Sequence, residues 1–211
     1  ILIIIKMVPV IFDLETSGLN PYHDDIIEIG AKVLNTDNSF QCLVKPKSNR
    51  PISKKITEIT TISNRQLRAE GKDWLNAYSE FYNWLLEVIQ FTQNVSIVSH
   101  NGDTFDFVFF KRMLKELNES GTDTSKINLD AIHFHDTLPL SKRLYPNRSY
   151  YNQPSLARMF NIMVINAHRA MGDVLVLEQI YPELMKNLES QIKCDPINNP
   201  SIVRDYIDLK I

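Results

Sequence analysis

The chain has 211 residues, and its 44% hydrophobic content is enough to bury one sizeable core in a single domain. A formal net charge of −2 excludes the strongly basic proteins that coat nucleic acid by charge alone, although it does not exclude nucleic acid as a substrate.

The two cysteines, Cys42 and Cys194, lie far apart in the sequence and lack metal-finger spacing, which favours reduced thiols inside a cell. The run from Ile1 to Ile5 is too short for a membrane span, and we expect it to lead into the first strand. The first residue is not methionine, so a trimmed, processed or partial chain is expected.

The stretch from Val8 to Leu19, V-P-V-I-F-D-L-E-T-S-G-L, is an apolar run that carries two acids. In a strand, Asp13 and Glu15 point to one face while Phe12 and Leu14 pack on the other. Buried carboxylates without a partner are costly, so a divalent cation is the natural counter-charge. The alternative is a strand end whose acids lie in solvent.

Two antiparallel strands are expected next, over residues 25–34 and 39–45, joined by a polar turn. Residues 46–67 carry isoleucines at helical spacing among many β-branched residues, which predicts short helical turns. A packing helix is predicted over residues 73–90, because its aromatic and aliphatic residues recur at intervals of three and four.

The short β-branched strand 95–99 runs into H-N-G-D, and a helix is predicted from about Thr104 to Leu117. Asp103 is then the expected N-cap, and Asp106 falls in the first helical turn. The simple interpretation of Asp106 is an acid that stabilises the positive end of that helix.

A polar linker over 119–128 precedes a strand at 131–135, a helix that starts near Asp136, and a short helix at 155–160. The last predicted helix covers about 170–186, with His168 and Asp173 at its start. From Leu188 the pattern loses its periodicity. This order of elements predicts an α/β fold with a mixed sheet covered by helices.

Four acids therefore stand at the ends of elements: Asp13, Glu15, Asp106 and Asp173. Such oxygen-rich sites suit Mg²⁺ or Mn²⁺, and two ions ~4 Å apart can hold both oxygens of a phosphodiester displacement. His168, whose side chain type titrates near neutrality, is the candidate base. Taken alone, a histidine is more often an ordinary surface or core residue.

Three motifs carry a family resemblance: I-F-D-L-E-T-S-G-L, H-N-G-D-T-F-D-F and H-R-A-M-G-D-V-L-V-L. In this order and spacing they resemble the motifs of the DnaQ-like DEDDh 3′-to-5′ exonucleases. The resemblance spans about Val8 to Leu184, and the wording of the second and third motifs is most similar to the TREX branch.

The resemblance implies an RNase H-like, mixed five-stranded sheet flanked by helices. It implies that Asp13, Glu15, Asp106 and Asp173 bind two Mg²⁺ ions, for which Mn²⁺ can substitute, and that His168 deprotonates the attacking water. A nucleoside 5′-monophosphate would leave the 3′ end of single-stranded DNA, or of RNA. Expected substrate contacts come from Thr16, Leu19, Asn101 and Phe105, although Phe105 is also a candidate core residue of its helix.

Residues 1–187 are the expected exonuclease domain, and 188–211 a tail of unknown role. The expected partners are single-stranded 3′ ends, a second copy of the chain or a polymerase, with no membrane, in the cytoplasm or nucleus (of a host cell if the protein is viral). Two alternatives stay open: a proofreading subunit and a module that binds nucleic-acid ends without cutting. The basic residues Lys45, Lys47, Arg50, Lys54 and Lys55 could follow a phosphate backbone, but a solvated face is favoured.

Overall fold

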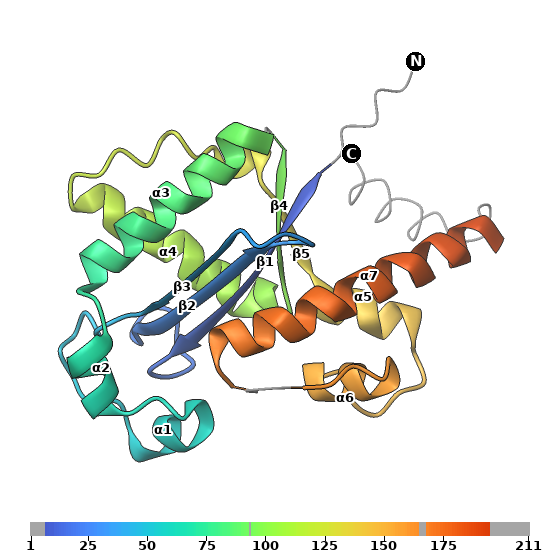
Figure 1. Cartoon of the computed structure of the whole chain (residues 1–211), viewed down its shortest axis with the longest axis horizontal. Helices are drawn as coiled ribbons and strands as arrows, with labels where there is room; N and C mark the ends of the chain where they lie inside the picture. The colour runs from blue at the N-terminus through green and yellow to red at the C-terminus, as the bar shows by residue number, and fades with distance from the viewer. Residues whose placement is uncertain (1–6, 93, 165–167, 195–211) are drawn as a thin grey trace.

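The computed structural model describes residues 7–92, 94–164 and 168–194. Its centre is a five-stranded sheet in the order β3-β2-β1-β4-β5 (Figure 1). The strands are β1 (Val8–Thr16), β2 (Ile26–Val33), β3 (Ser39–Leu43), β4 (Val95–Ser99) and β5 (His133–Asp136). β1 pairs antiparallel with β2 and parallel with β4, β2 pairs antiparallel with β3, and β4 pairs parallel with β5. The predicted mixed five-stranded sheet is confirmed.

Helices cover both faces of the sheet. α3 (Trp74–Thr92) and α4 (Asp106–Glu119) lie on one face, while α5 (Thr137–Leu144), α6 (Gln153–Met159) and α7 (Ala170–Cys194) lie on the other (Figure 1). The predicted turns after β3 form α1 (Lys54–Thr60) and α2 (Asn64–Glu70), whose N-caps are Ser53 and Ser63. Two short 3-10 helices, η1 (Gly102–Thr104) and η2 (Leu129–Ala131), precede α4 and β5.

The side chains of β1 divide between two cores, as their alternation predicts. Val10, Phe12 and Leu14 pack into the cluster beneath α3 and α4. Ile11 packs into the second cluster, with residues of α5, α6 and α7. Asp13 and Glu15 follow Ile11 at intervals of two, so they lie on the α7 face of the sheet.

Two boundaries differ from the predictions. Asp103 is not the N-cap of α4: it lies within η1, and Phe105 precedes α4 with no side-chain cap. The backbone of Phe105 is not helical (φ −135°, ψ −87°). This conformation lets the next residue, Asp106, point its carboxyl group into the interior. α7 continues beyond residue 186 to Cys194, because Leu188 is fully buried and Ile192 packs against the same core. The expected leader (1–5) and most of the expected tail (195–211) lie outside the described residues.

Candidate active site

Three of the predicted acids converge on the α7 face of the sheet. Asp13 and Glu15 come from β1, and Asp173 lies in the first turn of α7. One ligand oxygen from each lies within 4.8 Å of the others. The three carboxylates are only partly exposed, so their charges are poorly screened. This arrangement fits a divalent cation, because hard oxygen donors are the ligands that Mg²⁺ and Mn²⁺ prefer.

Asp106 reaches the same region from the opposite face. The parallel ladder between β1 and β4 ends at Ile11 and Val98, and the Leu14 N–H beyond it donates instead to Asp106 Oδ1 at 3.1 Å. The Ser99 hydroxyl, at the end of β4, donates to Asp106 Oδ2 at 2.6 Å. Asp106 is thus a buried acid where two parallel strands diverge at their carboxyl ends, a usual position for ligand sites in α/β folds.

Burial and mutual repulsion dominate the electrostatics of these acids. Burial, followed by the charges of Asp106, Asp173, Glu15 and Glu28, raises the pKa of Asp13 well above its usual range. Burial and the charges of Asp173, Glu28 and Asp106 raise the pKa of Glu15 to about 8. Burial also raises the pKa of Asp106 to about 7, although hydrogen bonds from Ser99 and Leu14 act in the opposite direction. A bound cation would remove this repulsion.

His168 lies two residues before α7, and its side chain is exposed. Its backbone is in the left-handed region (φ 62°), and its N–H donates to Asp173 Oδ2 at 3.2 Å. Burial raises the pKa of Asp173, whereas the nearby His168 charge and this hydrogen bond lower it. The predicted base and the predicted ligand are therefore neighbours.

The expected substrate contacts have different environments. Thr16 is buried and donates its hydroxyl to Gly18 O at 2.5 Å, whereas Leu19 is 82% exposed. Asn101 is exposed in the left-handed region (φ 69°). Phe105 is partly buried against the core and meets the Phe109 ring edge-on, with centroids 5.0 Å apart.

Hydrogen bonds from a side chain of α4 hold the exposed loop that carries Leu19. Arg112 donates to Pro21 O at 2.5 Å and to Asp24 O at 2.7 Å. The Asp24 carboxylate accepts the Asn20 N–H at 2.8 Å, and a Cβ on Gly18 would lie 2.3 Å from Asp24 Oδ2. The loop therefore presents Leu19 from a preformed conformation.

One acid of β5 organises the second motif. The Asp136 carboxylate accepts the backbone N–H groups of Asn101 (2.8 Å), Asp103 (3.1 Å) and Leu138 (2.8 Å). It is the N-cap of α5, which starts where a helix was predicted, and it also holds the turn that leads to Asp106.

Sequence reasoning missed one buried acid, Glu28. It interrupts the apolar strand I-I-E-I-G and is fully buried. Arg169 donates to it from Nε (3.0 Å) and Nη2 (2.7 Å). A charge within a strand that otherwise reads as buried was the available signal.

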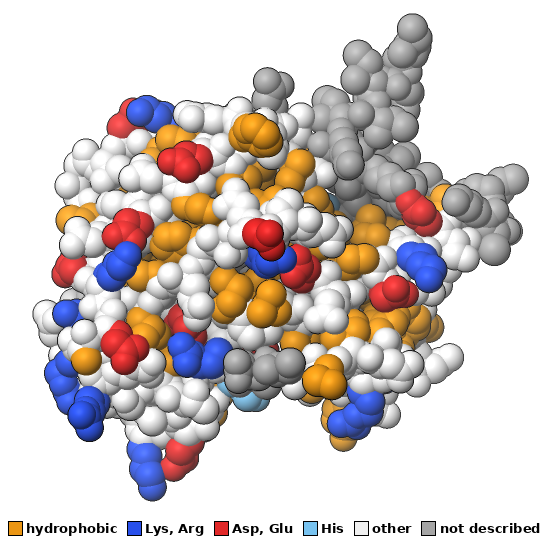
Figure 2. All heavy atoms as spheres, in the orientation of Figure 1, with side chains coloured by type: hydrophobic (Ala, Val, Ile, Leu, Met, Phe, Trp, Pro, Cys, Tyr) orange, Lys and Arg blue, Asp and Glu red, His pale blue; other side chains and the backbone are white. Residues whose placement is uncertain are grey.

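The basic residues after β3 lie on a mixed surface. Figure 2 shows Lys and Arg side chains gathered over the corner formed by α1 and α2, with acidic side chains between them. Lys47 pairs with Glu116 at 3.1 Å, and Lys54 with Glu58 at 3.5 Å. These ion pairs agree with a solvated face, and a role in phosphate binding stays a prediction.

Solved structures show that this fold occurs in other proteins. The chain superimposes on E. coli exonuclease I in complex with a dT13 oligonucleotide with a TM-score of 0.72, at 17% identity, over 89% of this chain and 43% of that one. The zinc-bound form of an E. coli exonuclease I–ssDNA complex gives a TM-score of 0.67 at 18% identity, over 88% and 43%. The fold is that of a DnaQ-like exonuclease domain.

The chain belongs to the RNase_T exonuclease family, whose model matches residues 10–181. The PolC-type DNA polymerase III of Caldanaerobacter subterraneus subsp. tengcongensis is 30% identical over 95% of this chain. The PolC-type DNA polymerase III of Thermotoga petrophila is 32% identical, also over 95%. The chain spans only 13% and 14% of these two relatives. Among the described residues, we find no helix that is long and apolar enough to cross a bilayer.

Proposed function

We propose that the chain is a metal-dependent 3′-to-5′ exonuclease that releases nucleoside 5′-monophosphates from single-stranded DNA. The observation that carries this proposal is the convergence of Asp13, Glu15 and Asp173, with oxygens within 4.8 Å of one another in a chain of the exonuclease family. The raised pKa values of these acids support it, because groups held under such repulsion are typical of cation sites and catalytic centres.

Asp13, Glu15 and Asp173 would hold the divalent cations, and Asp106 would complete the set from beside Asp13. Two Mg²⁺ or Mn²⁺ ions would neutralise the carboxylates and polarise the phosphodiester when bound. Asp106 already accepts hydrogen bonds from Leu14 and Ser99, which fix the direction of its remaining lone pairs.

His168 would take the proton from the attacking water. Its exposed position agrees with this role, because a base must reach a water at the open side of the site. The hydrogen bond from its N–H to Asp173 ties the base to a metal ligand, so both would be positioned together. Leu19 would contact the terminal base, with Thr16 and Asn101 near the sugar and phosphate; Phe105 serves mainly as packing.

Replacing His168 with glutamine should lower kcat by about 10²-fold, because the variant keeps the size of the side chain but has no imidazole to accept a proton from water. The measurement is the initial rate of 3′ shortening of labelled single-stranded DNA from pH 6 to 9. His23→Gln, in the loop after β1, is the matched control and should retain the wild-type rate. Undiminished cleavage by H168Q would remove His168 from the mechanism.

Single-stranded DNA is the favoured substrate because the exonuclease I structures with similar folds contain dT13 and ssDNA. A terminal nucleotide must also be unpaired to enter such a site, which favours strands that are already single. RNA stays a possible substrate, and the similarity to the TREX branch stays a prediction.

A second candidate function is proofreading beside a DNA polymerase. The observation that favours it is the 30–32% identity to PolC-type DNA polymerase III over nearly the whole of this chain. In that case the polymerase would deliver the mismatched 3′ end, and the chemistry of the site would be the same. A non-cleaving module is disfavoured, because binding alone does not require four repelling acids beside a histidine.

The proposal is tested with 5′-labelled single-stranded DNA and RNA of one sequence, incubated with Mg²⁺, Mn²⁺ or EDTA. We expect a ladder that shortens from the 3′ end with either cation and vanishes with EDTA, and DNA should be cut faster. Cleavage that persists in EDTA would contradict the metal requirement. No cleavage of either strand, with or without a polymerase partner, would contradict the exonuclease assignment.

A further inference from the structure

Glu28 is a completely buried carboxylate at the edge of the acidic cluster. In the β1–β2 ladder it lies directly opposite Glu15, and Gly30 lies opposite Asp13. Residues that face each other in an antiparallel pair have side chains on the same side of the sheet. Glu28 therefore belongs to the α7 face, beside the predicted metal ligands.

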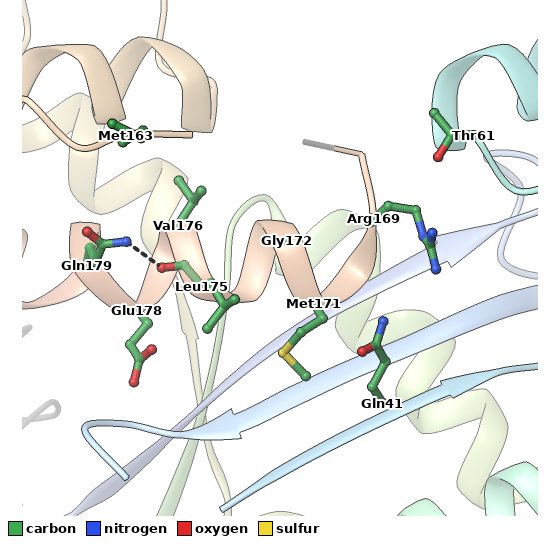
Figure 3. Close-up of a pocket in the computed structure, with 10 residues that line it drawn as sticks. All are labelled: Gln41, Thr61, Met163, Arg169, Met171, Gly172, Leu175, Val176, Glu178 and Gln179. Atoms are coloured by element: carbon green, nitrogen blue, oxygen red, sulfur yellow. Dashed lines mark hydrogen bonds between the residues drawn. The ribbon is translucent and has the colours of Figure 1, made fainter. Parts of the chain in front are cut away.

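Within the described residues, hydrogen bonds occupy both of its oxygens. Oε1 accepts from Arg169 Nη2 (2.7 Å) and Gln41 Nε2 (3.0 Å), while Oε2 accepts from Arg169 Nε and the Ala170 N–H (both 3.0 Å). Figure 3 shows Arg169 and Gln41 on the sheet side of the pocket along α7. Because these hydrogen bonds already occupy both of its oxygens, Glu28 is less able to bind a cation than the three converging acids are.

The groups that Glu28 binds are those that position the catalytic segment. Ala170 is the first residue of α7, and Arg169 O accepts the Asp173 N–H at 2.9 Å. The Asp173 carboxylate in turn accepts the His168 N–H. Hydrogen bonds to Glu28 thus hold the stretch from His168 to Asp173 against β2, and two further hydrogen bonds within the stretch fix its own conformation.

The backbone also comes unusually close to β2 at this point. A Cβ on Gly30 would lie 2.7 Å from the Ala170 carbonyl carbon and 2.8 Å from Met171 N. Such a contact leaves little freedom for the start of α7, and it sets the separation of Asp173 from Asp13 and Glu15 across the two strands.

We propose that Glu28 is a positioning residue: through Arg169 and the Ala170 N–H it fixes the start of α7, so that Asp173 and His168 meet the acids of β1 in the geometry needed for cation binding and hydrolysis. This inference rests on the proposed function. Glu28 contacts no reacting atom. A carboxylate suits the task because it accepts the planar Arg169 fork and a backbone N–H at once, which an apolar residue cannot do.

The chain offers a matched control in the ion pair between Lys32 and Glu178. It joins the same two elements, β2 and α7, and Glu178 also accepts the Asn35 N–H at 3.1 Å. Figure 3 shows Glu178 further along α7 than Arg169. Glu178→Gln therefore loosens the same pair of elements away from the acids.

The test compares the wild type, E28Q and E178Q by calorimetric Mn²⁺ titration and by kcat and KM on single-stranded DNA. For E28Q we expect Mn²⁺ affinity and kcat each to fall about tenfold, while KM changes less than about twofold, because partners of metal ligands act on geometry and not on strand binding. For E178Q we expect changes below about twofold in Mn²⁺ affinity and kcat.

Equal effects of E28Q and E178Q, or no effect of E28Q, would overturn the proposal, since Glu28 would then be an ordinary tie between β2 and α7. If E28Q does not fold, Arg169→Lys decides: it keeps the charge but loses the fork, and it should lower Mn²⁺ affinity and kcat in the same direction. A wild-type protein that binds Mn²⁺ but cuts no strand would overturn the proposed function alone, and the Mn²⁺ titrations would still decide the role of Glu28.

Discussion

Replacing Asp13 with asparagine is expected to reduce exonuclease activity by at least about 10³-fold, because the variant loses one of the three carboxylates that converge at the cation site. Asp13 feels the charges of Asp106, Asp173, Glu15 and Glu28, so it is the acid on which the cluster converges. The measurement is single-turnover cleavage of 5′-labelled single-stranded DNA with saturating Mn²⁺, which separates loss of chemistry from weak binding.

The same variant should unfold at a higher temperature when no metal is present. An uncharged amide removes one member of a repelling cluster, and a gain of about 1 kcal/mol corresponds to about 2–4 °C for a domain of this size. Asp37→Asn, in the exposed turn between β2 and β3, is the matched control and should change neither activity nor melting temperature. Wild-type activity in D13N would contradict the assignment of the site.

The metal-free protein is expected to lose stability as the pH rises from about 5 to 8. In the folded chain the pKa of Glu15 is raised from 4.5 to about 8 and that of Asp106 from 3.8 to about 7. Over this interval the folded state keeps protons that the unfolded chain has released, so the unfolding free energy falls with pH. With about 1.4 kcal/mol per pH unit for each proton, and with Glu15 partly exposed, the total loss should be on the order of several kcal/mol.

The measurement is the urea unfolding free energy at pH 5, 6, 7 and 8 in EDTA, repeated with Mg²⁺. Mg²⁺ should stabilise the protein most at pH 8, where the acids are ionised and the cation binds only the folded state. D13N should show a shallower dependence on pH. A metal-free stability that rises between pH 5 and 8 would show that the acids are not under mutual repulsion.

The alternation and periodicity of residue types predicted the positions of the strands and of the acids on them, for a physical reason. The alternation of Phe12, Asp13, Leu14 and Glu15 is a property of the strand itself, so the face of each side chain follows from its position alone. Asp173 was placed at a helix start by the periodicity that follows it. The three acids that the structure brings together were therefore predictable, although their mutual distance was not.

The errors and omissions depend on distant contacts. Asp103 is a suitable N-cap by residue type. However, hydrogen bonds from the Leu14 N–H and the Ser99 hydroxyl hold Asp106 in the interior, and α4 begins at Asp106 instead. The end of α7 was set too early, because the burial of Leu188 depends on packing against other helices. Glu28 was missed because its partners, Arg169 and Ala170, lie 141 and 142 positions away.

That separation also bears on how the molecule folds. The site joins β1 and α7, so its acids meet only through contacts between distant parts of the chain, and contacts of such long range form slowly. A growing or truncated chain that lacks α7 would carry Asp13 and Glu15 without Asp173, and thus no complete cation site. Cation binding by all three acids therefore reports the docking of α7 onto the sheet, and hydrolytic capacity depends on that contact.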